Sequence, residues 1–183
     1  MRTIMEEAGG IIIGGVIFLT LITLFSRIGD TARAQSFKDA AQESTTNASD
    51  IMEREFRLIG YGYTDTTYIL KADSASITFR ADLNDDGIVD TVAYGLSAVV
   101  YAGQNTTAPR ILQRTPGHGL AAPVATGITK FALDYFDRSG NPTTTIANIR
   151  SIRMSMISLA DADIDSTHPG VYWERTIKPK NMR

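Results

Sequence analysis

Oxygen-bearing side chains recur at alternate positions in one short segment of the chain, between residues 82 and 90. Their spacing matches the first nine positions of an EF-hand-type calcium loop, in which alternate side chains of a tight turn converge on one ion. Gly87 allows the sharp turn, and Ile88 stands where such a loop offers a backbone carbonyl. A set made only of oxygen ligands suits Ca²⁺. The candidate ligands are Asp82, Asn84, Asp86, Ile88 and Asp90.

The same segment also fits a solvated β-hairpin turn, since Asn, Asp and Gly favour turns that hold no metal. Ala93 occupies the twelfth position, where an EF-hand loop has a bidentate glutamate. We therefore expect any calcium affinity to be weak, with a dissociation constant of roughly 0.1 to 1 mM. A bound ion would tie Asp82 to Asp90 and stiffen the hairpin, and it would carry out no chemistry.

Two carboxylates, Glu6 and Glu7, stand at the edge of a long apolar run. A carboxylate that enters hydrocarbon without a partner costs several kcal/mol, so Glu6 needs a cation beside it. The alternative is that both acids lie at a membrane interface and have no role in assembly.

Residues that could carry catalysis are scarce. The chain has no cysteine, which excludes disulfides, thiolate metal sites and a cysteine nucleophile. His118 and His168 each lie among Pro and Gly residues, so we expect them in exposed turns. The nucleophile elbow, the phosphate loop and the paired-histidine helix motif do not occur. The sequence therefore predicts a protein that is not an enzyme.

Composition limits the remaining classes. At 183 residues, with 43% hydrophobic content, the chain has room for one compact head beside a membrane segment. The formal charge of −2 and the pI near 5.7 give no basic footprint. We therefore expect no nucleic acid as a direct ligand.

The element that positions the two acids is an apolar helix within residues 1–25. Residues 8–25 form an uncharged run of 18 residues, which as a helix spans about 27 Å and is long enough to cross a bilayer. Because Glu6 and Glu7 directly precede the run and a helical pattern follows it, we interpret it as a retained membrane helix and not as a cleaved signal peptide.

Helical periodicity continues through residues 26–60. Small and apolar residues recur at spacings of three and four, which predicts an amphipathic continuation that packs on the head. The whole rod of ~55 residues would be about 80 Å long and would end at Gly60 and Gly62. The residues of the inward face are Phe37, Ala41, Thr45, Ala48, Met52, Phe56 and Ile59.

Residues 61–183 change to a period of two with frequent turn residues, which predicts strands. A helix first and antiparallel strands afterwards predict an α+β fold, a long N-terminal helical spine packed on a C-terminal antiparallel sheet of about four to six strands. The alternating sets begin at Ile77, Val92, Phe131 and Ile152, with a weaker candidate at residues 171–178.

The segment Arg2-Thr3-Ile4-Met5-Glu6 before a long apolar helix resembles the mature N-terminus of type IV pilins and of type II secretion pseudopilins. If Arg2 is the first mature residue, Thr3 and Glu6 fall on the threonine and glutamate positions of that family. Met1 stands where the family has its leader glycine, and Glu7 is an additional acid. The resemblance implies that Arg2, Thr3 and Glu6 act in assembly, with Glu6 pairing with the N-terminal amine of a neighbouring subunit.

Looser similarities in the head favour a minor pilin or pseudopilin. The resemblance implies a structural subunit whose partners are other pilin subunits. It also implies a single-pass inner-membrane protein with an extracytoplasmic head, which becomes part of an extracellular pilus or a periplasmic pseudopilus. Two alternatives stay open: a main pilin that forms the whole filament, and a membrane-anchored extracytoplasmic binding domain.

Overall fold

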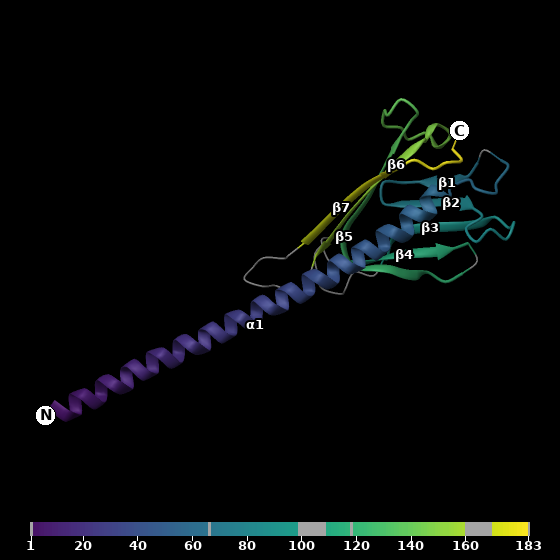
Figure 1. Ribbon diagram of the computed structural model, residues 1–183. Coiled ribbons are helices and arrows are strands. Elements are labelled where there is room, and N and C mark those ends of the chain that lie inside the picture. Colours follow the sequence, from purple (N-terminus) through teal and green to yellow (C-terminus); the bar gives the residue numbers. More distant parts are fainter. Residues whose placement is uncertain (1, 66, 99–108, 118, 160–169, 183) are drawn as a thin grey trace.

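The computed structural model describes residues 2–65, 67–98, 109–117, 119–159 and 170–182, without the side chains of residues 2–12, 34, 37 and 159. The fold is α+β, as predicted: one long N-terminal helix is followed by a curled antiparallel sheet. Figure 1 shows the helix passing across the sheet with its C-terminal part and projecting far beyond the head with its N-terminal part.

The helix α1 runs without a break over Arg2–Arg57, 56 residues, or about 84 Å at 1.5 Å per residue. No proline occurs before Pro109, so nothing in this stretch removes a helical hydrogen bond. The chain then turns at Gly60, whose φ of 79° is a left-handed conformation that glycine adopts without strain. The Gly60 backbone N–H donates to the carbonyl of Arg80, 2.9 Å away, so the helix end is joined directly to the sheet.

Seven strands form one sheet in chain order, and each is antiparallel to its neighbours. The sequence predicts about four to six strands, so the predicted count is too low. The strands are β1 (Ile69–Ala72), β2 (Ser76–Ala81), β3 (Asp90–Leu96), β4 (Arg110–Pro116), β5 (Ala122–Phe136), β6 (Ser151–Leu159) and β7 (Gly170–Ile177).

The strand β5 is 15 residues long and belongs to both halves of the sheet. Its first part pairs with β4, and its second part, from Ile128 onward, pairs with β6. Beyond β4, the free edge of β5 is covered by the β1–β2 turn, where the Leu133 backbone N–H donates to the Ser74 carbonyl at 2.8 Å. The Tyr135 hydroxyl donates to the Asp73 carbonyl at 2.8 Å in the same place. These contacts curl the sheet toward itself.

The core lies between the C-terminal half of α1 and the curled sheet. The ring of Phe56 meets those of Phe79 and Tyr94 edge to face, with centroids 5.5 and 5.6 Å apart. The helix also packs on β5, β6 and β7. The buried apolar side chains on this side are Ala48, Met52 and Phe56 of α1 and Ile59 in the turn just after it, all members of the predicted inward face.

Candidate functional site

The N-terminal half of α1 is apolar, and none of the residues that the structure describes covers it. Large apolar side chains are exposed on all sides of this half, because they occur at consecutive positions as well as at spacings of three and four. The helix has the length and composition to cross a membrane. Its most apolar stretch has a mean hydropathy of 1.5, and 0% of that stretch is buried against the described residues. The exposed residues are Ile13, Val16, Ile17, Phe18, Leu19, Leu21, Ile22, Leu24, Phe25 and Ile28.

Two threonine hydroxyls within this apolar half are bonded inside the helix. Thr20 donates to the Val16 carbonyl at 2.7 Å, and Thr23 donates to the Leu19 carbonyl at 2.8 Å. In hydrocarbon an unpaired hydroxyl is costly, and these i to i−4 bonds remove that cost. The surface that this half offers is therefore apolar in its chemistry as well as its composition.

Arg2, Thr3 and Glu6 lie in the first two turns of α1. Their side chains are outside the described part of the structure, so their role in assembly stays a prediction.

The opposite half of α1 is fixed to the sheet by a buried carboxylate, Glu55, whose side chain is on the packed face and only 6% exposed. It accepts a hydrogen bond from the Tyr94 hydroxyl at 2.6 Å and bonds from Arg114 Nε at 2.9 and 3.0 Å. We call these three residues the Glu55 cluster. Burial raises the pKa of the Tyr94 phenol well above its usual range, and the charge and hydrogen bond of Glu55 raise it further. The cluster joins α1 to β3 and β4.

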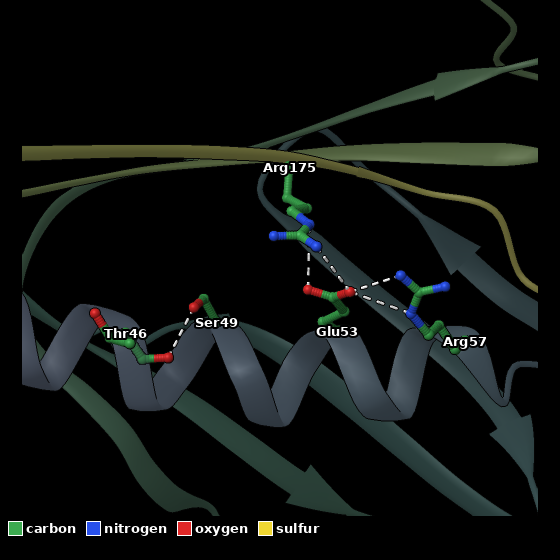
Figure 2. Close-up of polar contacts among 5 residues, drawn as sticks. All are labelled: Thr46, Ser49, Glu53, Arg57 and Arg175. Carbon is green, nitrogen blue, oxygen red and sulfur yellow. Dashed lines mark hydrogen bonds and ion pairs between the residues drawn. The ribbon is translucent and has the colours of Figure 1, made fainter.

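A second carboxylate, Glu53, joins the same turn of α1 to β7 (Figure 2). Arg57 Nη2 lies 2.6 Å from Glu53 Oε1, and Arg175 Nε lies 3.2 Å from Oε2. The hydrogen bond from Arg57, and less strongly the charge of Arg175, lower the pKa of the Glu53 carboxyl against the opposing effect of burial. We call these three residues the Glu53 cluster. One turn earlier, the Ser49 hydroxyl is satisfied by the Thr46 carbonyl at 2.7 Å, so it needs no partner in the sheet.

The two clusters act in different directions around the helix axis. The Glu55 cluster reaches β3 and β4, whereas the Glu53 cluster reaches β7 at the edge of the sheet. Two carboxylates two residues apart therefore fix the rotation of α1 on the head as well as its position. Because the helix is continuous, the direction of the projecting apolar half is fixed with them.

Neither cluster is among the predicted sites. A signal for Glu55 was present: it stands four residues before Ile59 and three after Met52, so it lies on the buried stripe. A carboxylate on such a stripe requires a partner, because an unpaired buried charge is costly. No local pattern could have named Tyr94 and Arg114, which are 39 and 59 residues away.

The predicted calcium segment is the loop between β2 and β3, and it brings Asp82, Asn84 and Asp86 together. Asp82 is 4% exposed and accepts bonds from the backbone N–H groups of Asp86 at 3.2 Å and Gly87 at 2.9 Å. Asp86 in turn accepts from Asn84 Nδ2 and from the Ile88 backbone N–H, both at 2.7 Å.

These bonds are those of a tight polar turn, with Gly87 at φ 82° as the predicted sharp bend. Asp90 begins β3 opposite Ala81. Across the described residues, no three His, Cys, Asp or Glu side chains are grouped so as to hold a metal ion. Calcium binding by this loop stays a prediction, and an ion would have to replace backbone donors at Asp82 and Asp86.

The loop is also attached to the end of the helix. The Asp82 backbone N–H donates to the Tyr61 carbonyl at 2.9 Å, and the Tyr61 hydroxyl donates to Asp85 at 3.0 Å. A Cβ atom on Gly62 would lie 2.8 Å from the Cβ of Asp82, so only glycine allows this approach. The loop therefore has a structural role at the point where the spine meets the head.

Comparison of the chain with known protein families finds none that matches, and comparison with curated proteins finds no matching sequence. The features of the molecule that bear on its function are therefore the exposed apolar half of α1 and the two clusters that fix its direction.

Proposed function

We propose that this chain is a structural subunit of a type IV pilus-like filament or secretion pseudopilus, in the manner of a minor pilin. The apolar half of α1 would hold the subunit in the inner membrane before assembly, with the head on the extracytoplasmic side. In the filament, the same surface would pack against the apolar helices of neighbouring subunits.

The observation that carries this proposal is the continuity of an uncovered apolar half with a half that is fixed on the head by the Glu53 and Glu55 clusters. A large exposed apolar surface requires a bilayer or another protein to cover it. A simple anchor needs no fixed angle to its head. A filament spine does, because the angle of each subunit sets the path of the polymer.

The glycines of the apolar half suit close helix packing, and the residues before it suit a charge pair between neighbours. Gly14 and Gly15 have no neighbour within 4 Å of an added Cβ, so the space beside them on the helix surface is open. Small residues at such positions let helix backbones approach closely when there is no water to exclude. Removal of Met1 would leave Arg2 with a free amine, and the Glu6 carboxylate of a neighbour would then have the cation that its desolvation requires.

The test is a pair of substitutions in the full chain, made in the cells that produce it. Glu6→Ala is expected to abolish recovery of the protein in a sheared filament fraction while leaving it in the membrane fraction. Glu7→Ala is the matched control, since it removes an adjacent acid that the proposal does not use. Mass spectrometry should find Arg2, free or methylated, as the first residue. Equal filament recovery from both variants, or a wild-type chain that stays monomeric in the membrane, would favour the anchored binding domain.

A further inference from the structure

The face of α1 that points away from the sheet carries two groups of charged residues, first acids and then, further along the helix, bases. Asp39, Glu43 and Asp50 are exposed and lie on one stripe, opposite the buried stripe, at helical spacings of four and seven. Asp39 and Glu43 also line a shallow hollow on this stripe with Gln42, Thr46 and Asn47. We call the three acids the acidic block.

The basic block follows on the same stripe and extends onto the C-terminal segment. Its members are all exposed, and the Lys180 backbone N–H lies 3.3 Å from the Arg57 carbonyl, which places the C-terminal segment beside the helix end. Glu53 is the acid that neutralises part of this block, through Arg57 and Arg175. The block consists of Arg54, Arg57, Arg175, Lys178 and Lys180.

Within the described part of the subunit, the remaining charges of the two blocks have no oppositely charged partner, and Asp39 accepts a hydrogen bond from Gln35 Nε2 at 3.4 Å. In the described ranges of the chain, no ion pair joins any acid of the acidic block to a base, and none involves Arg54, Lys178 or Lys180. A single subunit therefore presents an unpaired anionic surface and an unpaired cationic surface on one side of its spine.

We infer that these two surfaces bind each other between copies of this chain, the basic block of one subunit against the acidic block of the next. The inference rests on the proposed function. On α1 the acids are centred on residue 44 and the bases lie at Arg54 and Arg57, so the two centres are about 12 residues apart, which corresponds to an axial offset of roughly 17 Å. Parallel neighbours without an offset would place acid against acid and base against base, which is repulsive. The charges thus favour a staggered neighbour over one in register.

The apolar half of α1 selects parallel neighbours over antiparallel ones. An antiparallel pair would also bring acid to base, but it would send the two apolar halves in opposite directions, away from any shared membrane or core. A parallel, offset contact is heterologous, since each copy uses a different surface toward its neighbour above and its neighbour below. Such contacts do not close, and they generate an open filament.

The experiment uses the full chain assembled from detergent solution by detergent removal, with polymer measured by sedimentation and electron microscopy. Asp39→Lys with Glu43→Lys reverses the acidic block, and Arg54→Glu with Lys180→Glu reverses the basic block. Each pair is expected to raise the concentration needed for polymer roughly tenfold, the size expected from two or three exposed ion pairs. All four changes together, or a mixture of the two doubly substituted chains, should restore assembly.

Controls separate this inference from the proposal on which it rests. Lys130→Glu changes an exposed charge on β5, outside both blocks, and should leave assembly unchanged. A wild-type chain that forms no polymer would contradict the proposed function itself. Wild-type polymer with equal assembly by every charge variant would overturn only the contact inferred here.

The absence of cysteine from the chain permits a direct test of the offset. Gln42→Cys and Asn181→Cys introduce one thiol beside each block without removing a charge. A bismaleimide should join a Gln42→Cys copy to an Asn181→Cys copy in the assembled mixture. Stronger cross-linking between two Gln42→Cys copies would indicate neighbours in register and would overturn the inference.

Discussion

Glu55 is the side chain that contributes most to fixing α1 on the sheet. Its carboxylate is buried and receives bonds from two different strands, so both of its partners lose their acceptor if it is removed. Glu55→Ala is expected to lower the free energy of unfolding by about 3 kcal/mol, the lower end for breaking a buried pair because Arg114 is still partly hydrated. Lys178→Ala, an exposed change, should cost less than about 0.5 kcal/mol. Denaturant unfolding in detergent measures both, and equal stabilities would contradict the role of Glu55.

Tyr94 makes the stability of the head dependent on alkaline pH. Its pKa is raised in the folded state, so the folded chain holds this proton more tightly than the unfolded chain does. The stabilisation is complete below the unfolded pKa of about 10 and is lost as pH rises from there toward the folded value, at up to about 1.4 kcal/mol per pH unit.

Tyr94→Phe should therefore be less stable near neutral pH, by about 1–3 kcal/mol for the missing bond to Glu55. Its stability should also fall less steeply above about pH 10. Tyr68→Phe, which removes a phenol outside the Glu55 cluster, is the control for general effects of tyrosine ionisation. If the free energies of unfolding of wild type and Tyr94→Phe fall in parallel between pH 9 and 12, the buried phenol is not the cause of the loss of stability at alkaline pH.

The β2–β3 loop is the residue-scale feature for which a ligand is predicted. If Ca²⁺ binds with the weak affinity expected, a concentration of about ten times the dissociation constant should stabilise the chain by about 1.4 kcal/mol. Asp90→Asn should reduce this gain while leaving the bonds of Asp82 to the backbone in place. The measurement is the melting temperature in calcium and in chelator, and identical melting in both would sink the metal hypothesis.

At the scale of elements, the junction between spine and sheet depends on Gly62, because two separate constraints meet there. Its φ of 71° is strained for other residues, and an added Cβ would lie 2.8 Å from the side chain of Asp82. Gly140 has a similar φ of 83° but open space around it. Gly140→Ala should thus cost about 1–2 kcal/mol for the backbone alone, and Gly62→Ala clearly more. If both substitutions lower the melting temperature equally, the β2–β3 loop can move away from an added Cβ at Gly62 without a loss of stability.

The elements that could be predicted from the sequence are those with strong periodicity. Ile77 and Phe79, or Ile152 and Met154, alternate with polar residues because one face of each strand is buried, and the structure confirms strands there. β4 escaped prediction because Leu112 is the one fully buried side chain in seven residues, so no alternation exists to detect. β1 is only four residues long, with Ile69 alone fully buried.

The polar contacts of the candidate site are of two kinds, and only the local kind could be predicted from the sequence. The spacing of the candidate ligands correctly located a tight turn at Asp82–Asp86, because turn chemistry is local. The Glu53 cluster joins residues 122 positions apart, and such a pairing depends on the order and curl of the whole sheet. Local spacing carries no information of that kind.

At the scale of the whole molecule, the head and the apolar half of α1 are structurally separate. Every buried side chain described in α1 lies at Thr45 or later, so the core takes nothing from the first turns. A chain of residues 26–183 should accordingly stay folded, with a melting temperature within a few degrees of that of the full chain in detergent, and it should sediment as a monomer. Circular dichroism and analytical centrifugation test this, and an unfolded or polymeric fragment would contradict it.

The order of the strands has a consequence for how the chain reaches this state. Each strand pairs only with its neighbours in sequence, so the sheet can form hairpin by hairpin as the chain emerges, which favours fast folding. The helix is made first, yet it packs on β5, β6 and β7 and receives Arg175 from the last strand. Its buried stripe, with Met52 and Phe56, must therefore stay uncovered until synthesis is nearly complete. During that interval, anchoring of the N-terminal half of α1 in a bilayer would keep nascent copies apart from one another. The apolar half that makes polymerisation possible would thus also delay polymerisation until each head is folded.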